Sequence, residues 1–409
     1  MGRRRALEGI RVLDLTQFES GTACTETLAW LGAEVIKIEP PGTGEQSRRA
    51  DREHPDRDAF YFLLLNASKK SITLNLKDER GKEIFRQLIG RSDVLVENFA
   101  PGTIERLGFG PNEVQAINPR MIYARIKGFA PGSPYENFLV YDSVAQAAGG
   151  SVSITGESMN HTPVKPGPNL ADTGAGLHCA IGVLAALYDR EKSGTGQRVE
   201  ISMQDAVINF CRVVYAQSFR TGQPAVRLGT KNQLMSSSPS GLYRCKPGGP
   251  NDYCFIYGSR AGEAGNRQWE RLLKVIGRTD LVGDPRFASP ELRYQHTELV
   301  DSVITDWTTT KSKQEVMLEL GAAMVPVGAV YDTVELANDP FLREHGMFVT
   351  VDHPEWGAIT MPGSPIRLSQ SPTEVIAAPL LGQHNDEVLG ELLDLSEERR
   401  AELRSAGVV

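Results

Sequence analysis

The sequence predicts an α/β protein whose large domain, built on a mainly parallel sheet, is interrupted by a smaller α+β domain. Three observations lead to this prediction. Short apolar segments alternate with helical segments through the first half of the chain, which is typical of parallel strands covered by helices. A stretch rich in Gly, Pro and Ser separates this half from a second group of elements. The length, 409 residues, is too great for one simple core.

The strands of the predicted sheet are short runs of apolar and β-branched residues. We expect them over 11–16, 34–39, 71–76, 93–98, 121–126 and 197–202. Helices are expected over 23–32, 79–89 and 143–150, and a long helix follows Asp172 and ends near Gly194. Strands joined through helices in this way predict a Rossmann-like sheet.

The second half has a different pattern, with helices in the majority. We expect helices over 204–218, 267–276, 291–307 and 313–320, strands over 253–257 and 325–331, and a helical end over 382–405. The large domain is therefore assigned to 1–221 and, with a return linker, to 333–409. Residues 222–252 are assigned to a linker or active-site loop, and 253–332 to the small inserted domain.

Composition narrows the class of protein. Forty per cent hydrophobic and 23% charged residues are typical of a soluble globular protein. The formal net charge of −7 argues against a nucleic-acid-binding protein. The basic start, Met1 to Arg5, is followed by no apolar segment of the kind found in signal peptides. No run approaches about 18 to 20 apolar residues, so we expect no membrane span.

The five cysteines are odd in number and widely scattered. This pattern favours reduced thiols, and hence a cytoplasmic protein, over a disulfide framework. There is no CxxC or HExxH motif, and the seven histidines form no cluster with metal-ligand spacing. We therefore expect neither a structural nor a catalytic metal.

The start of the sheet invites a nucleotide-binding interpretation, because Glu39 ends the second strand where a carboxylate often holds a ribose. The first turn, from Thr16 to Thr22, however, has one glycine and no GxGxxG motif. Without those glycines the backbone cannot approach a pyrophosphate in the usual way. A GxxxxGK[ST] motif is also absent, so neither dinucleotide binding nor P-loop chemistry is supported.

Asp172 is the strongest single candidate for chemistry. It stands where the small-residue segment Asn169-Leu-Ala-Asp-Thr-Gly-Ala-Gly176 becomes a helix. Small residues let a ligand approach the backbone, and the free N–H groups of a first helical turn favour negative charge. A carboxylate there can act as a covalent nucleophile. The alternative is that Asp172 only caps the helix through its side chain.

Other candidates stand in loops at strand ends. Lys69, Lys70 and Arg106 are placed to meet phosphates at such positions, or are ordinary solvated charges. Tyr141 and Asp142 precede the predicted helix over 143–150. Tyr141 either orients a catalytic carboxylate or packs at the start of that helix.

Taken together, the motifs resemble the class III, formyl-CoA transferase-like CoA-transferases, the CaiB/BaiF type. The resemblance extends over nearly the whole chain and depends on the order of the motifs. They are Leu7-Glu-Gly-Ile-Arg-Val-Leu-Asp-Leu-Thr16, Leu31-Gly-Ala-Glu-Val-Ile-Lys-Ile-Glu39, Lys70-Ser-Ile-Thr-Leu74, Glu97-Asn-Phe-Ala-Pro-Gly102, Tyr141-Asp-Ser-Val-Ala-Gln146, Leu170-Ala-Asp-Thr-Gly174, Gly194-Thr-Gly-Gln-Arg-Val-Glu200 and Ala378-Pro-Leu-Leu-Gly-Gln-His384.

The resemblance implies an interlocked homodimer of Rossmann-like large domains with smaller domains on two long connections. It also implies that Asp172 is the nucleophile. In this chemistry the aspartate attacks an acyl-CoA thioester to give an anhydride, and the CoA thiolate then forms an aspartyl-CoA thioester that the acceptor acid attacks. No metal and no cofactor other than the substrate CoA is implied.

The resemblance also assigns binding residues. Asn98, Phe99 and Arg106 match positions that line the CoA site, Leu74 matches an adenine-side position, and Tyr141 matches a substrate-side tyrosine. Two positions depart on the substrate side, where Glu19 replaces a common glutamine and Ala50 replaces a bulky aromatic.

Two further departures concern CoA and the loop over the aspartate. Leu139 falls where relatives have a CoA-contacting lysine. A mobile tetraglycine loop corresponds here to Ser236-Ser-Ser-Pro-Ser-Gly241.

We therefore expect a cytoplasmic, homodimeric CoA-transferase that uses a succinyl-CoA-like donor and a dicarboxylate-type or aryl-substituted acid. The alternatives are a formyl-CoA:oxalate CoA-transferase, an acyl-CoA racemase or epimerase, and a non-catalytic acyl-CoA-binding subunit, in a hetero-oligomer with a paralogue. A racemase needs an acid/base pair beside the α-carbon, and its relatives have histidine where this chain has Tyr141. Retention of Asp172 in its motif argues against a non-catalytic subunit.

Overall fold

The computed structural model describes residues 4–51, 53–231, 237–258 and 262–409. By internal contacts the chain forms two units. Unit 1 comprises residues 1–151, 165–210 and 340–409, and unit 2 comprises 152–164 and 211–339. The second unit is therefore an insertion in the first, with chain boundaries that differ from the 221/222 and 332/333 divisions expected from sequence.

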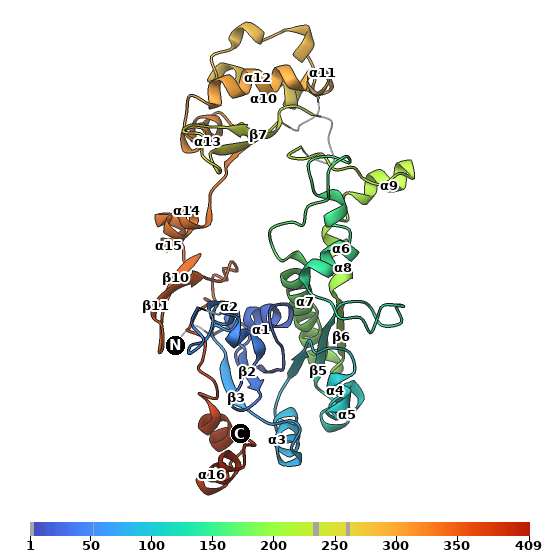
Figure 1. Ribbon diagram of the computed structural model, residues 1–409, viewed down its shortest axis with the longest axis vertical. Coiled ribbons are helices and arrows are strands. Elements are labelled where there is room, and N and C mark those ends of the chain that lie inside the picture. The colour runs from blue at the N-terminus through green and yellow to red at the C-terminus, as the bar shows by residue number, and fades with distance from the viewer. Residues whose placement is uncertain (1–3, 52, 232–236, 259–261) are drawn as a thin grey trace. The chain divides into compact units, whose positions relative to one another are not determined.

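Unit 1 is built on a six-stranded, wholly parallel sheet with the order β3-β2-β1-β4-β5-β6 (Figure 1). Its strands are β1 Arg11–Asp14, β2 Glu34–Glu39, β3 Lys70–Thr73, β4 Val94–Glu97, β5 Ile122–Lys127 and β6 Arg198–Ser202. The four central strands are almost continuously buried and rich in Val, Ile and Leu, as strands covered on both faces must be. The carboxyl ends of β1 and β4 lie side by side, which brings the loops that follow them together.

Helices α1 (Ser20–Trp30) and α7 (Leu170–Ser193) pack together on one side of the sheet. Their crossing is close because Gly176 has no side chain. A Cβ atom there would lie 2.5 Å from the carbonyl oxygen of Ser20 and 2.9 Å from the Cβ of Ala23. Helices α6 (Asp142–Ala148) and α8 (Met203–Phe210) pack against α7. A Cβ at Gly174 would likewise lie 2.2 Å from the ring of Phe210.

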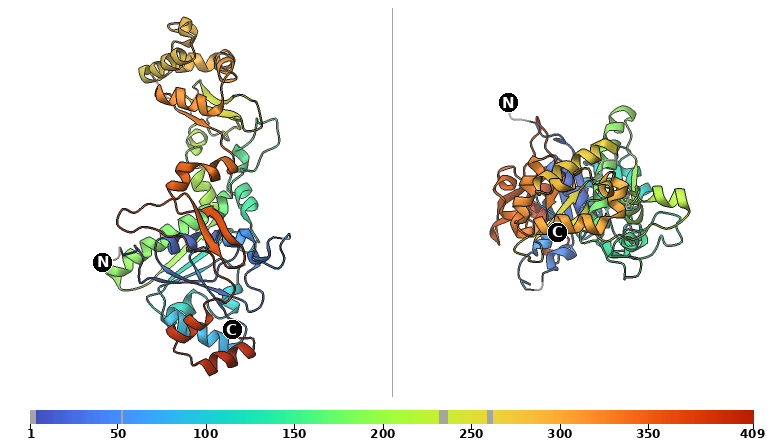
Figure 2. Two further views of the ribbon diagram at one scale, coloured as in Figure 1. Left: turned by 90° about the vertical axis from the view of Figure 1, so that its left-hand side faces the viewer. Right: turned by 90° about the horizontal axis from the view of Figure 1, so that it is seen from above.

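The opposite side of the sheet is covered by α3 (Glu79–Gly90), α4 (Thr103–Arg106), α5 (Pro111–Ile117) and the C-terminal segment (Figure 2). That segment contains the π-helical turn Glu387–Leu392 and α16 (Glu397–Ser405). Its Leu389 and Leu403 are fully buried in one core with Leu13, Ile36 and Phe85. The end of the chain is thus part of the first domain, as the sequence predicts.

Smaller elements complete unit 1. The turn Gln46–Arg49 and α2 (Phe60–Leu63) connect β2 to β3. Helix α15 (Pro340–Glu344) leads into an antiparallel hairpin, β10 (Phe348–His353) and β11 (Gly357–Pro362), which packs on Phe62 and Leu63. The sequence analysis did not predict this hairpin.

Unit 2 has its own antiparallel sheet, β7-β8-β9, and its own hydrophobic core. The strands are β7 Ser240–Arg244, β8 Tyr253–Tyr257 and β9 Val327–Ala329. The helices and turns of the unit are η2 Val152–Ile154, α9 Tyr215–Thr221, α10 Gly262–Val275, η3 Thr279–Leu281, η4 Pro285–Phe287, α11 Pro290–Gln295, α12 Thr297–Thr308, α13 Lys313–Ala322 and α14 Thr333–Asn338. Unit 2 thus combines a small antiparallel sheet with several helices.

Some predicted elements differ in detail. The helix expected over 204–218 is two helices, α8 and α9, which fall in different units. The helix expected over 291–307 is divided into α11 and α12 at His296, whose backbone is not helical. The linker expected over 222–252 contains β7, whose pairing partner β8 lies further along the chain.

Helix α7 is long and apolar enough, by length and composition alone, to cross a membrane. Half of its most apolar window is buried inside the protein, where it packs on α1, β5 and β6. The central helix of a folded domain passes the same test, and these contacts explain why α7 does.

Candidate active site

Asp172 lies in the first turn of α7, and a different carboxylate caps that helix. The N-cap residue is Asn169, whose side chain makes no capping hydrogen bond. Instead Oδ1 of Asp142, at the start of α6, accepts hydrogen bonds from the backbone N–H groups of Ala171 (3.0 Å) and Asp172 (3.3 Å). Within the described chain, no hydrogen bond to the Asp172 carboxylate is present. The alternative that Asp172 serves only as a cap is therefore wrong.

The electrostatic surroundings of Asp172 disfavour its charged form. Burial, followed by the charges of Glu19 and Asp142, raises the pKa of its carboxyl from 3.8 to about 7. Lys165 lowers the same pKa, by a smaller amount. Its ammonium lies 3.4 Å from Oδ2 of Asp142. A carboxyl with so large a shift, beside a cleft, is typical of a functional site.

Glu19 is distant from Asp172 in the chain, at the N-cap of α1, and it is 7% exposed. Its carboxylate accepts hydrogen bonds from Nδ2 of Asn169 (2.7 Å) and Oγ1 of Thr173 (2.6 Å), residues that flank Asp172. The hydroxyl of Tyr61 donates a third, at 3.3 Å. Glu19 is therefore fixed against the first turn of α7 by neutral donors.

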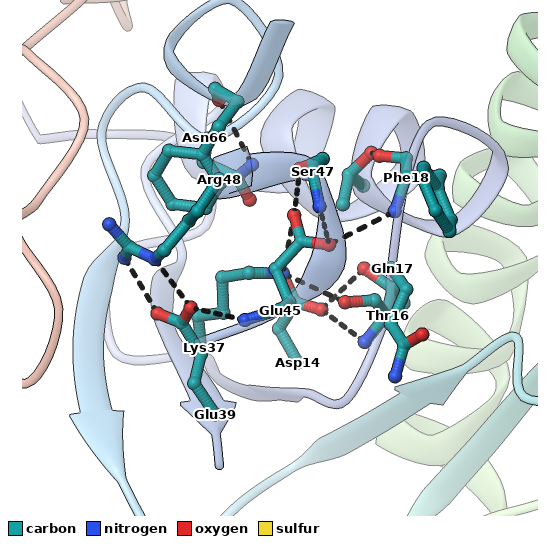
Figure 3. A network of polar contacts seen from close by, with 12 residues as sticks. Asp14, Thr16, Gln17, Phe18, Lys37, Glu39, Glu45, Ser47, Arg48 and Asn66 are labelled. Carbon is teal, nitrogen blue, oxygen red and sulfur yellow. Dashed lines mark hydrogen bonds and ion pairs between the residues drawn. The ribbon is translucent and has the colours of Figure 1, made fainter. Parts of the chain in front are cut away.

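The turn between β1 and α1 is held by side chains from neighbouring strands (Figure 3). Asp14 Oδ1 accepts from the N–H of Thr16 at 2.8 Å, and the buried Lys37 donates to the carbonyl of Thr16 at 2.8 Å. Asn98, after β4, both accepts from and donates to the backbone of Gln17 at 2.8 Å. These bonds occupy the backbone groups that a glycine-rich turn would offer to a pyrophosphate.

Asp172 opens on a cleft of about 210 Å³ in unit 1. The residues that line it include Phe18, Asn98 and Phe99 from the strand ends and Leu139 and Tyr141 from the segment before α6. The rings of Phe18 and Tyr141 meet edge to face, with centroids 6.4 Å apart. The cleft is thus bounded by aromatic and apolar side chains on both sides of the carboxylate.

A second pocket of about 430 Å³ adjoins the first. It is lined by Leu74, Thr103 and Leu107 among others, and it shares Gln17 and Phe99 with the cleft that contains Asp172. The two spaces therefore lie next to each other, and many of the residues that line the second one are apolar. Such a shape suits a long ligand with one reactive end.

The structure brings together most of the residues predicted from sequence. Asp172, Asn98, Phe99 and Tyr141 line one cleft, and Leu74 lines the pocket next to it. Glu19 lies behind Asp172 and lines neither space. The binding and catalytic roles that the resemblance assigns to these residues stay predictions.

The remaining predicted residues are placed differently. Arg106 is exposed and bonds to the hydroxyl of Thr103 at 2.9 Å, outside both linings. Ala50 is exposed at the end of the turn after β2 and also lines neither space. Ser236 lies outside the described residues, and Ser240 and Gly241 begin β7.

The structure contradicts two expectations: that Lys69 and Lys70 meet phosphates, and that the glycines after Asp172 make room for a ligand. Lys69 meets no phosphate, because it is buried and its ammonium lies 3.0 Å from Asp14 and 2.9 Å from Asn66. Lys70 is bonded to Glu34 and Glu387. The glycines after Asp172 make room for α1 and Phe210, as described above, and not for a ligand.

Several side chains around Asp172 and Glu19 were not identified from the sequence. Asp142 was noticed only as a neighbour of Tyr141, and Tyr61, Lys165 and Asn169 were given no role in the site. Asn169 and Thr173 are near Asp172 in the chain and were available as signals. Tyr61 and Lys165 belong to segments whose approach to Asp172 depends on tertiary packing.

The described residues contain no group of three or more His, Cys, Asp or Glu side chains arranged to hold a metal ion. All five cysteines are buried and unoxidised.

Replacing Asp172 with Asn should increase thermal stability at neutral and higher pH. The folded protein raises the pKa of Asp172 to about 7 from 3.8, so wild-type stability falls between about pH 4 and pH 7 as the unfolded chain ionises first. Asp172→Asn lacks this loss. We expect a melting temperature a few degrees higher at pH 8, and no difference below about pH 4, by scanning calorimetry. A lower melting temperature at pH 8 would contradict the assigned desolvation.

The sequence profile of CoA-transferase family III matches residues 7–385. The chain is similar to the formyl-CoA:oxalate CoA-transferases of Streptomyces avermitilis and Streptomyces coelicolor, each 44% identical over 418 residues. The matches cover 99% of this chain and 100% and 99% of those proteins.

Solved structures give the same result. A CAIB/BAIF family protein from Brucella suis superposes with a TM-score of 0.82 at 28% identity, covering 94% of this chain and 99% of that one. The Rv3272 protein of Mycobacterium tuberculosis superposes with a TM-score of 0.78 at 28% identity, covering 94% and 99%. On its sequence, its fold and the assembled carboxylate site, the chain belongs to CoA-transferase family III and is a CoA-transferase.

Proposed function

We propose that the protein moves CoA from an acyl-CoA to a free carboxylic acid through covalent intermediates on Asp172. The observation that carries this proposal is that Asp172 faces the cleft with no capping bond, while Asp142 satisfies the N–H groups of α7. A carboxylate freed in this way can act as a nucleophile.

The proposed exchange needs no net proton transfer. An oxygen of Asp172 attacks the thioester carbonyl, and the carbon–sulfur bond breaks. The products of this step are an aspartyl anhydride and free CoA thiolate. The thiolate attacks the aspartyl carbonyl and releases the donor acid as its carboxylate. The acceptor carboxylate then attacks the aspartyl-CoA thioester and expels the thiolate. Attack of the thiolate on the new acyl carbonyl gives the product acyl-CoA and restores Asp172.

The surroundings of Asp172 support this role. Burial and the like charge of Glu19 destabilise the free carboxylate. Both anhydride and thioester are neutral at that carboxyl, so forming them removes a charge from a site that disfavours it. The effect lowers the barrier for attack relative to a fully solvated carboxylate.

The adjoining pocket suits the distant part of CoA. Leu74, Leu76 and Leu107 offer it apolar surface, while Lys77 supplies a cation at its rim. Gln17 and Phe99 connect it to the cleft with Asp172. An extended ligand can therefore place its thioester at Asp172 and its base in the second pocket.

The identity of the acceptor acid is a further part of the proposal. The relatives named above act between formyl-CoA and oxalate, which favours oxalate as an acceptor. Glu19, an anion beside Asp172, favours an acceptor whose second charge lies farther away. The preference expected from Ala50 for larger acids rests on the resemblance, because Ala50 lies outside the cleft lining.

We further propose that the enzyme is a homodimer, as the resemblance implies. Helix α7 leaves Leu177, Ile181 and Tyr188 exposed, at 43%, 64% and 68%. Phe210 on α8 is also 47% exposed. Large apolar side chains gathered on packed helices are typical of a surface that associates.

The nucleophile can be identified by trapping. Incubation with an acyl-CoA, followed by hydroxylamine, should place a hydroxamate on Asp172, detected by peptide mass spectrometry. Asp172→Ala should lower the transfer rate on the order of 10⁴-fold or more, because no other group forms the anhydride. Binding of CoA, measured by calorimetry, should change little. Near-wild-type turnover in this variant would overturn the mechanism.

Substrate choice can be tested with paired substitutions. Glu19→Gln with Ala50→Trp should increase the use of oxalate relative to succinate or larger acids, by a factor that reflects about 1–3 kcal/mol. The measurement is kcat/KM for a panel of acids with formyl-CoA and succinyl-CoA as donors. If the wild type already prefers formyl-CoA and oxalate, the formyl-CoA:oxalate assignment replaces the larger-acid one.

Association can be measured by sedimentation velocity. We expect a dimer with no monomer on dilution to nanomolar concentration, because interlocked chains bury a large apolar interface. Replacing Ile181 with Asp should produce monomer or insoluble protein. A freely dissociating wild-type monomer would argue against the interlocked arrangement.

A further inference from the structure

The carboxylate of Glu45 contacts the active-site turn from behind, at a point where the backbone has an unusual conformation. Oε2 of Glu45 accepts a hydrogen bond from the N–H of Phe18 at 3.3 Å and from the N–H of Ser47 at 3.1 Å. The hydroxyl of Ser47 donates to the other oxygen. Glu45 is 3% exposed, so its carboxylate has little contact with solvent. Figure 3 shows this carboxylate between Ser47 and the backbone of Phe18.

The backbone conformation of Phe18 explains why this contact matters. Phe18 has a φ of 54°, in the left-handed region that bulky residues avoid. The fold must therefore hold it there. Asn98 binds the backbone of Gln17 on one side, and Glu45 binds the N–H of Phe18 itself.

The backbone conformation of Phe18 determines the directions in which the side chains of Phe18 and Glu19 point. Phe18 lines the cleft beside Asp172 and packs against Tyr141. Glu19 follows directly, and its carboxylate reaches Asn169 and Thr173 on either side of Asp172. A relaxed φ at Phe18 would turn both side chains away from these partners.

Glu45 is itself rigidly supported. Its N–H donates to Oε2 of Glu39 at 3.1 Å, and Glu39 makes two bonds to Arg48, of 2.6 and 2.7 Å. The ammonium of Lys37 lies 3.9 Å from Oε1 of Glu45. The loop after β2 thus delivers one fixed carboxylate to the turn after β1.

We propose that Glu45 is a positioning residue for catalysis, which holds Phe18 in its left-handed conformation and thereby keeps Glu19 against the helix turn that carries Asp172. The catalytic half of this inference rests on the proposed CoA transfer. The structural half, the restraint of Phe18, does not.

Two substitutions of Glu45 distinguish the loss of its hydrogen-bond acceptor from the loss of its negative charge. In Glu45→Gln an amide oxygen can still accept from Phe18, while the amide nitrogen donates to the Ser47 hydroxyl. In Glu45→Ala the acceptor is lost. Ser47→Ala is the matched control, because it removes another bond to the same carboxylate and leaves Phe18 bonded. If Glu45→Ala is insoluble, Glu45→Ser, which is too short to reach Phe18, takes its place.

The first measurement is amide hydrogen exchange of the peptide containing Phe18, in the protein without substrates. We expect at least a tenfold faster exchange at Phe18 in Glu45→Ala, and exchange within twofold of wild type in Glu45→Gln and Ser47→Ala. This result is independent of any activity. Unchanged exchange in Glu45→Ala, or equal acceleration in Glu45→Gln, overturns the proposed restraint, since the latter would indicate a charge effect through Lys37.

The second measurement is steady-state CoA transfer. Glu45→Ala should lower kcat about tenfold. The KM for acyl-CoA should stay within twofold of the wild-type value, even though Glu45 also lines the second pocket. Glu45→Gln should retain wild-type kcat. In a Glu19→Ala background, Glu45→Ala should cost less than twofold in kcat, because its effect passes through Glu19.

A fully additive loss in that background, or a rise in KM alone, overturns the catalytic role. If wild-type enzyme shows no CoA transfer, the proposed function fails, and the exchange result still decides the restraint of Phe18.

Discussion

The hydrogen bonds from the first turn of α7 to Asp142 determine what the rest of the site can do. A helix start needs an acceptor for its free N–H groups, and the side chain of Asn169 at the N-cap would be an ordinary choice. Because Asp142 on α6 takes this role, Asp172 remains available to face the cleft. The N–H groups of one helix are thus bonded by a side chain of another helix, and the carboxylate of Asp172 has no hydrogen-bond partner among the described residues.

This arrangement has an energetic cost. Three carboxyl groups lie around one helix turn, those of Glu19, Asp142 and Asp172. The cation Lys165 lies near them and pairs with Asp142. Desolvated like charges destabilise the folded state. In the proposed mechanism the same repulsion favours the neutral covalent intermediates, a compromise that is common at active sites.

The sequence predicted the parallel sheet, α7 and the inserted unit, because buried strands and long apolar helices carry strong periodic signals. It did not predict β7, which lies in a segment rich in Gly, Pro and Ser, or the β10–β11 hairpin, although burial alternates along both of its strands. Within the site, Asp172, Asn98 and Phe99 were found through their motifs. Tyr61 and Lys165 were missed because their contacts with the site depend on packing between distant segments. Lys69 was misread because a buried lysine paired with Asp14 looks, in sequence, like any loop lysine.

The close crossing of α1 and α7 at Gly176 has a mechanical consequence. The helix that begins at Glu19 and the helix that carries Asp172 touch backbone to side chain, so they move as one body. Two like charges on separate flexible loops relieve their repulsion by drifting apart. Here the close packing of the two helices opposes that relaxation, so the repulsion between the two carboxylates persists. The absence of a side chain at Gly176, four residues from Asp172, thus helps to maintain this repulsion.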